Sequence, residues 1–351
     1  MKNPNYENRI RVFLVILILL ISTTSNCSRF EKEDGKNSEP LTQLGFLSIL
    51  GCTQYQNAPR VDTVGGLTRI FVPPSFTFPC VSRYNDPHLI FVPSSSPKNI
   101  LSVFLPGSGG SPIGVSKIIE EGARRGYHSV GLTYPNADPI NVICNSGPYQ
   151  SLACFGEVRE ETLTGADLSK AIAVDYNNSI EGRLLKLLSY LSVQRPNDGW
   201  KQFLKEGDVD WNKVHFGGHS QGSGHAAYQG KRRLLGRVSL YSGVSDYHLL
   251  SSTPASWLSE SGTTPSDRYF GLIHVEDPVA NFSGDSDQVT DVWLNSFGMI
   301  GAVTDADSGV PPYGNSQRLT TNLCASSEDG GKHNCTMNEG QRTVWDYISF
   351  P

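Results

Sequence analysis

The chain has 351 residues, of which 38% are hydrophobic and 18% are charged, and its formal net charge is -5. This composition is that of a globular protein long enough to bury a sizeable core in one large or two medium domains. The net charge is acidic, and no cluster of Lys and Arg is interleaved with aromatic residues. We therefore exclude a nucleic-acid surface and expect no nucleic-acid partner.

Residues 1–26 have the pattern of a signal peptide. Lys2, Arg9 and Arg11 precede an apolar run at residues 12–22, which is short for a transmembrane helix but suits a signal peptide. Small or polar residues then lead to Cys27, and this segment resembles the lipobox of bacterial lipoproteins. The resemblance implies export, with a lipid on Cys27 that anchors the chain to a membrane; plain secretion with cleavage nearby is the alternative. Residues 27–45 are expected to be a polar tether.

Six further cysteines form an even set in a chain that is expected to leave the reducing cytosol, which favours three disulfides. Buried free thiols are the alternative, and six cysteines allow about 15 connectivities. A metal site is not expected, because there is no CxxC pair and no HExxH motif. Sequence proximity favours pairing Cys52 with Cys80, Cys144 with Cys154, and Cys324 with Cys335.

From about residue 67 the chain alternates short β-branched or aromatic runs with longer segments of helical character. This rhythm predicts an α/β fold: a doubly wound, mostly parallel sheet with helices on both faces, in a single domain at 46–351. The expected strands, in chain order, are 67–72, 88–93, 99–106, 128–135, 212–218, 236–243 and 268–276. The expected helices are 111–127, 179–192, 221–233 and 339–350. Surface excursions are expected near 135–179 and 278–330.

The stretch VHFGGHSQGSGHA at residues 214–226 places several glycines where an expected strand meets an expected helix. Gly218-His219-Ser220-Gln221-Gly222 matches G-x-S-x-G, and the setting of strand, turn and helix is the one that a nucleophile elbow requires. On these residues the chain resembles the α/β-hydrolase superfamily from about residue 67 to its end. The strained turn would expose Ser220, while Gly218 and Gly222 let strand and helix cross closely. An ordinary glycine-rich turn is the alternative.

The resemblance implies that an acid and then a histidine follow the serine along the chain. Asp277 stands at the carboxyl end of the last expected strand, where catalytic groups of such sheets collect. His333 is the one histidine downstream of it. Asp246, after the preceding strand, is the rival acid, and Glu276 should point elsewhere if the alternation of the strand persists. We expect Ser220 as nucleophile, His333 as base and Asp277 as the group that orients it.

The loop LPGSGGSP follows the third expected strand. In the superfamily this loop supplies one backbone N–H to the oxyanion and the residue after the nucleophile supplies the other. The resemblance therefore implies Ser108 or Gly109 together with Gln221. We interpret His219 as lining the substrate pocket. The two strand histidines, His215 and His274, are read as structural.

Together these features predict an exported serine hydrolase that cleaves a carboxylic ester through an acyl-enzyme. It needs no cofactor. The substrate would be a small-molecule, lipid or polyester ester, while amide cleavage and acyl transfer remain open. The alternative is a catalytically silent binding lipoprotein on the same scaffold.

Overall fold

The computed structural model describes residues 58–81, 83–94, 96–279, 287–324 and 331–351. The described residues all belong to one compact unit. The predicted signal peptide and tether, with the expected lipidation site Cys27, lie outside the described residues.

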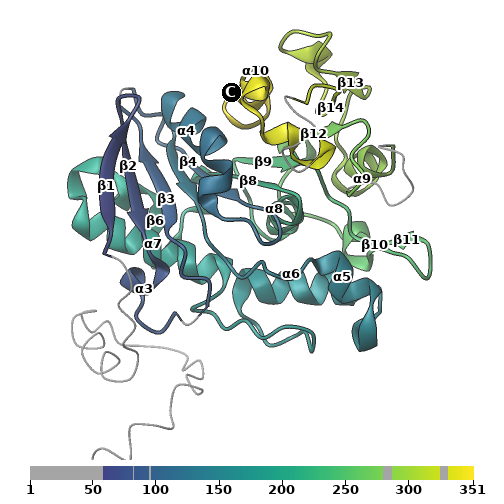
Figure 1. Cartoon of the computed structure of the whole chain (residues 1–351), viewed down its shortest axis with the longest axis horizontal. Coiled ribbons are helices and arrows are strands. Elements are labelled where there is room, and N and C mark those ends of the chain that lie inside the picture. Colours follow the sequence, from purple (N-terminus) through teal and green to yellow (C-terminus); the bar gives the residue numbers. More distant parts are fainter. Residues whose placement is uncertain (1–57, 82, 95, 280–286, 325–330) are drawn as a thin grey trace, which may run out of the picture. The chain divides into compact units, whose positions relative to one another are not determined.

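A ten-stranded sheet runs through this unit of the described chain (Figure 1). Its first three pairings are antiparallel and the remaining six are parallel. The strands, in spatial order, are β1 (Arg60–Val64), β2 (Leu67–Val72), β3 (His88–Val92), β5 (His128–Gly131), β4 (Leu101–Leu105), β8 (Val214–His219), β9 (Arg237–Tyr241), β12 (Tyr269–His274), β14 (Arg318–Thr321) and β13 (Thr304–Asp305). Two hairpins lie outside the sheet: β6 (Leu204–Lys205) with β7 (Asp208–Val209), and β10 (Tyr247–His248) with β11 (Thr253–Pro254).

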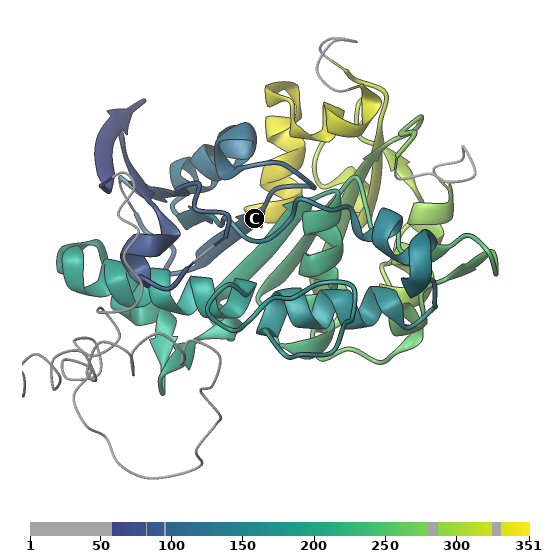
Figure 2. The ribbon, with the colours of Figure 1, turned by 60° about the horizontal axis from the view of Figure 1, so that its bottom comes forward.

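Helices cover both faces of the sheet (Figures 1 and 2). The α-helices are α3 (Pro74–Thr77), α4 (Ser116–Arg124), α5 (Ile140–Asn145), α6 (Cys154–Thr164), α7 (Ile180–Gln194), α8 (Gln221–Arg232), α9 (Asp287–Phe297) and α10 (Arg342–Ser349). The 3₁₀ helices are η1 (Pro112–Val115), η2 (Gly147–Tyr149), η3 (Pro196–Asp198), η4 (Trp200–Phe203), η5 (Trp211–Lys213), η6 (Ser256–Ser259), η7 (Ser266–Arg268), η8 (Tyr313–Asn315), η9 (Lys332–Met337) and η10 (Glu339–Gln341).

The sheet separates two hydrophobic clusters, and strand β4 shows why. Leu101, Val103 and Leu105 pack into the cluster under α6, α7 and α8, whereas Phe104 packs into the cluster under α4 and α10. Successive side chains of a strand point to opposite faces, so a strand covered on both sides is apolar throughout. The predicted fold class is confirmed: this is an α/β-hydrolase fold.

The two segments expected as surface excursions contain parts of the core instead. Phe155 and Leu163 of α6 are fully buried, and so is Leu319 of β14. The first of these segments also contains a buried acidic residue, Glu161. Its carboxylate accepts hydrogen bonds from backbone N–H groups of the following loop, including that of Ser169 at 2.8 Å. A buried charge satisfied in this way cannot be told from a solvated one in the sequence.

Two of the expected disulfides are confirmed. Cys144 is bonded to Cys154 and Cys324 to Cys335, with Cα–Cα distances of 5.6 and 4.9 Å. The third expected pair involves Cys52, which lies outside the described residues, so that pairing stays a prediction.

Within residues 58–351, gaps excepted, no helix is both long and apolar enough to cross a bilayer.

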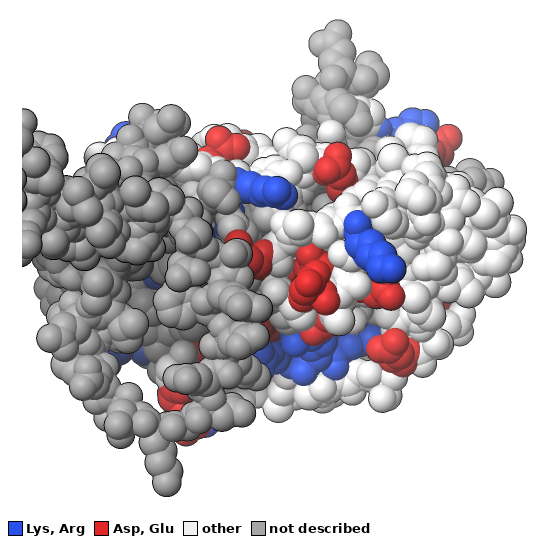
Figure 3. Space-filling model, turned by 90° about the horizontal axis from the view of Figure 1, so that it is seen from below, with Lys and Arg blue, Asp and Glu red and all other residues white. Residues whose placement is uncertain are grey.

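In Figure 3, acidic and basic side chains lie close together in the middle of one face, and its right-hand end is almost uncharged. No single sign of charge dominates this face.

Candidate active site

Ser220 occupies a strained turn between β8 and α8. Its φ is 56° and its ψ is -121°, a conformation that non-glycine residues rarely adopt. Its N–H donates to the carbonyl of Tyr241 at 2.8 Å. A Cβ at Gly218 would overlap the backbone of Gly222, and a Cβ at Gly222 would overlap the carbonyl of Leu105. The close crossing of strand and helix therefore excludes any side chain at these two positions, as the sequence suggested.

His333 and Asp277 form a hydrogen-bonded pair. His333 Nδ1 lies 2.8 and 2.9 Å from the two carboxylate oxygens of Asp277, which is fully buried. Because a carboxylate oxygen only accepts, Nδ1 carries a hydrogen, which in the neutral imidazole leaves the lone pair on Nε2. Asp277 follows the carboxyl end of β12, and His333 lies in η9, two residues from the disulfide-bonded Cys335.

The backbone of His333 is fixed by two side chains that donate to its carbonyl. The carbonyl of His333 accepts a hydrogen bond from His219 Nε2 at 3.0 Å and another from Ser242 Oγ at 2.7 Å. Burial, together with the nearby His333, lowers the pKa of His219 to about 4. His219 is therefore neutral at pH 7, and it both lines the pocket and positions His333.

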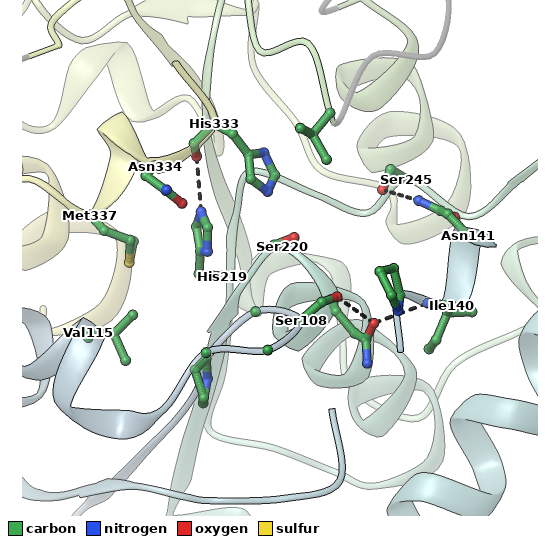
Figure 4. A pocket seen from close by; sticks show the side chains of 18 of the residues that line it. Ser108, Val115, Ile140, Asn141, His219, Ser220, Ser245, His333, Asn334 and Met337 are labelled. Atoms are coloured by element: carbon green, nitrogen blue, oxygen red, sulfur yellow. Dashed lines mark hydrogen bonds between the residues drawn. The ribbon is translucent and has the colours of Figure 1, made fainter. Parts of the chain in front are cut away.

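Ser220 and His333 face the same pocket, and Figure 4 shows the imidazole of His333 directed toward the opening in which Ser220 lies. No hydrogen bond joins the two side chains among the contacts of the described residues. Such bonds are often long or poorly aligned in free enzymes and tighten when substrate binds. The arrangement thus places the half-buried Ser220 and a histidine that a buried carboxylate orients on the same pocket.

Backbone N–H groups flank Ser220 on two sides. Among the described residues, neither the N–H of Ser108 nor that of Gln221 has a hydrogen-bond partner. Gly109, the other candidate in this loop, donates its N–H to the carbonyl of Asn136 at 2.8 Å. The expectation that Gly109 could supply the oxyanion N–H is therefore wrong, because its N–H already has a partner. Ser108 is the candidate donor that remains in this loop. Ser108 Oγ donates to Gln221 Oε1 at 2.7 Å, so the two candidates are also tied to each other (Figure 4).

The rival acid Asp246 has other partners. Arg159 Nε and Nη2 donate to its two carboxylate oxygens at 2.5 Å each, and Trp257 Nε1 donates to it at 2.8 Å. Both side chains of the ion pair are buried. The carboxylate of Asp246 is thus ion-paired with Arg159, and no contact between Asp246 and His333 is found among the described residues. Glu276 points away from the pocket, as expected, and pairs with Lys332 at the surface.

The pocket around Ser220 has a volume of about 880 Å³. In Figure 4, Val115 and Met337 border it on one side of Ser220, and Ile140 and Asn141 border it on the other. Of the described lining residues, Arg159 and Asp246 are the ones with formal charges, and they neutralise each other. Such a pocket suits an uncharged ligand, because a buried unpaired charge is costly.

Two residues that organise the site were missed in the sequence. Arg159 lies 87 residues from Asp246, and Asn136 meets the Gly107–Gly110 loop from the next strand along the sheet. One feature of the sequence points to the position of Arg159. A Cβ at Gly224 would overlap the guanidinium of Arg159, so this helix position must be glycine. A glycine inside a helix without a turn to explain it indicates such close packing. His215 and His274 are buried with backbone partners, as expected.

No group of three or more His, Cys, Asp or Glu side chains in the described part of the chain is arranged to hold a metal ion. No cofactor site was expected from the sequence. The chemistry available at this pocket is that of Ser220, His333, Asp277 and the neighbouring backbone amides.

Comparison with known proteins gives structural neighbours only. No family model and no curated protein matches the chain. Solved structures that resemble it include an α/β serine hydrolase homologue from Coxiella burnetii, at 10% identity and a TM-score of 0.40 over 84% of this chain and 97% of that one. An S-formylglutathione hydrolase from Agrobacterium tumefaciens gives 12% identity and a TM-score of 0.44 over 82% and 98%. A cold-adapted esterase from an Arctic intertidal metagenomic library gives 11% and 0.40 over 83% and 93%. The fold assignment rests on the sheet itself, and no activity is transferred from these structures.

Proposed function

We propose that the protein is a serine hydrolase that cleaves a carboxylic ester through an acyl-enzyme. The observation that carries the proposal is that three side chains from distant parts of the chain meet here, two of them lining one pocket and the third holding one of these from behind. Ser220 is presented on a strained turn, and His333 faces the same pocket while a buried Asp277 holds its Nδ1. Backbone strain of this kind persists only when the surrounding structure enforces it, and it concentrates at functional sites.

The proposed reaction begins when Ser220 Oγ attacks the acyl carbonyl and its proton passes to His333 Nε2. The carbonyl oxygen becomes an oxyanion, which the N–H groups of Ser108 and Gln221 stabilise. The C–O bond to the alcohol then breaks, and His333 returns the proton to the leaving alkoxide. Water attacks the acyl-enzyme in the same way, again giving its proton to His333, and releases the acid. Asp277 keeps the imidazole in the required tautomer throughout.

The direct test is labelling with a fluorophosphonate probe and hydrolysis of p-nitrophenyl butanoate by wild type and Ser220→Ala. We expect labelling and turnover in wild type and neither in the variant. Ser223→Ala is the matched control, because the Ser223 hydroxyl is buried in α8, does not line the pocket and has no described partner. It should retain both activities. A folded wild-type protein that neither labels nor turns over would favour the silent binding protein instead.

The natural substrate class is proposed as an uncharged ester. The supporting observation is the pairing of Arg159 with Asp246, which leaves the described lining without a net charge. A panel of small-molecule, triglyceride and polyester substrates, with amides beside them, ranks the candidate substrates. Hydrolysis of amides at the rate of esters would contradict the ester assignment.

Export and a lipid anchor at Cys27 are also proposed. The two disulfides support export, because disulfides persist in oxidising compartments. Cys27→Ala should release the protein from the membrane fraction. Unchanged partitioning of this variant would contradict the anchor.

A further inference from the structure

The loop between β4 and η1, residues 106–110, is held by the segment that follows β5. Asn136 Nδ2 donates to the carbonyl of Gly107 at 2.7 Å and to the carbonyl of Gly110 at 2.8 Å. Tyr134 Oη donates to the carbonyl of Pro106 at 2.8 Å. Three carbonyl groups of one short loop are thus fixed by two side chains.

The same loop is fixed at three more points. The carbonyl of Asn136 accepts the N–H of Gly109 at 2.8 Å, the carbonyl of Gly107 also accepts the N–H of Gly110 at 3.0 Å, and Ser108 Oγ donates to Gln221 Oε1 at 2.7 Å. Among the described residues, the N–H of Ser108 is left without a partner. The loop is therefore built so that this amide stays available while its neighbours are engaged.

The bond from Asn136 to Gly107 has a direct geometric consequence. The carbonyl of Gly107 and the N–H of Ser108 belong to one peptide unit, and in a planar trans peptide these two groups point in opposite directions. Holding the carbonyl toward Asn136 turns the Ser108 N–H the other way. This peptide lies against the nucleophile, since a Cβ at Gly107 would stand 3.0 Å from the Cβ of Ser220.

We infer that Asn136 is the positioning residue of the oxyanion donor, an inference that rests on the proposed function. Asn136 is buried, with a relative exposure of 6%, so water does not compete for its amide hydrogens. An amide side chain suits the task because its two N–H groups can donate to two carbonyls at once. Asn136 touches no reacting atom; it acts through the peptide that it orients.

The sharpest perturbation is Asn136→Asp, which keeps the shape and replaces the donor by an oxygen facing two carbonyl oxygens. Repulsion should turn the Gly107 peptide and withdraw the Ser108 N–H. Loss of one oxyanion donor lowers kcat by about 100- to 1,000-fold, so we expect kcat for p-nitrophenyl butanoate to fall about 100-fold with KM changed by less than about 3-fold.

Asn145→Asp is the matched control. Asn145 Nδ2 also donates to a backbone carbonyl, that of Tyr247 at 2.9 Å, and its Oδ1 accepts the N–H of Leu249. Asn145 does not line the pocket. We expect this variant to keep wild-type kcat within about 3-fold, while its melting temperature falls by an amount similar to that of Asn136→Asp.

A pair of inhibitors separates positioning from a general structural role. A trifluoromethyl ketone adds Ser220 Oγ at its carbonyl and becomes an oxyanion, whereas the corresponding trifluoromethyl carbinol binds without forming one. In Asn136→Asp the inhibition constant of the ketone should rise about 100-fold, and that of the carbinol should stay within about 3-fold. Tyr134→Phe removes the hydrogen bond to the carbonyl of Pro106 and keeps the ring. We expect this variant to raise the inhibition constant of the ketone by about 3- to 10-fold.

The outcomes distinguish this inference from the proposed function. Equal weakening of ketone and carbinol, or wild-type kinetics in both Asn136→Asp and Tyr134→Phe, would overturn the role of Asn136 while the hydrolase stands. If Asn136→Asp does not fold, the ketone-to-carbinol ratio of Tyr134→Phe decides. A wild-type protein that neither labels nor cleaves esters would overturn both.

Discussion

Two aspartates follow neighbouring strands of the sheet. We expect that replacing each by asparagine impairs a different property of the protein, either turnover or stability. Asp277→Asn removes the acceptor that holds the tautomer of His333. Asp246→Asn breaks the ion pair with Arg159. The first change should abolish turnover in a folded protein, and the second should destabilise the fold.

The magnitudes follow from the contacts. An amide at Asp277 can present its NH₂ to His333 and stabilise the wrong tautomer, which in a Ser-His-Asp triad lowers kcat about 10⁴-fold. The side chains of Arg159 and Asp246 are 3% and 1% exposed. Removing one partner of such a pair leaves an uncompensated buried charge and costs about 3–5 kcal/mol. For a domain of this size, that loss lowers the melting temperature by roughly 10 °C.

The assay measures p-nitrophenyl butanoate turnover and thermal unfolding on the same preparations of wild type, Asp277→Asn and Asp246→Asn. Turnover is expressed per folded molecule, so loss of fold is not counted as loss of catalysis. The reasoning is refuted if Asp246→Asn loses turnover at a wild-type melting temperature, because Asp246 would then be the acid. Near-wild-type turnover in Asp277→Asn would refute it equally.

Three further predictions concern stability and the position of His333. Burial lowers the pKa of His219 to about 4 from 6.5, so its contribution to stability is present above pH 6.5 and is lost as the pH falls toward 4, by about 2 kcal/mol at pH 5. Urea unfolding at pH 7 and pH 5 should therefore show a smaller loss in His219→Gln, and an equal loss in both proteins would contradict this. Replacing Cys324 and Cys335 by serine should reduce kcat and lower stability by about 2–3 kcal/mol, whereas unchanged kinetics would mean that the disulfide does not hold His333. Gly224→Ala, which would normally stabilise a helix, should cost about 1–3 kcal/mol because its methyl overlaps the guanidinium of Arg159; a raised melting temperature would contradict the overlap.

The elbow was predictable from the sequence because most of its signals are local. Gly218 must lack a side chain because the backbone of Gly222 lies against it four residues later, and the periodicity of the sequence indicates the flanking strand and helix. The requirement at Gly222 comes from the carbonyl of Leu105 on the neighbouring strand, which only the structure shows. The nearby cysteines, Cys144 with Cys154 and Cys324 with Cys335, are likewise close along the chain. Loop closure over a short distance is entropically cheap, so proximity was a sound guide.

The edges of the sheet were less predictable. The insertion of β5 between β3 and β4 depends on pairings between distant segments, and β14 is a four-residue strand within a loop-like composition. Short strands carry little periodic signal, and their pairing partners decide whether they form. The same holds for α6, which lies in a segment expected at the surface, whereas in the structure Glu161 is buried and accepts backbone N–H groups of the following loop.

By itself the sequence determined the class of fold, the elbow at Ser220 and the chain order in which Asp277 and His333 follow it, because these depend on local backbone geometry and on where strands end. Only the tertiary structure decided that Asp246 pairs with Arg159, that the N–H of Gly109 is engaged and that of Ser108 is not, and that Asn136 donates to the carbonyl of Gly107 beside Ser220. Hydrogen bonds between residues tens of positions apart depend on strand order and on side-chain direction within about an ångström. Neither leaves a periodic trace in the sequence.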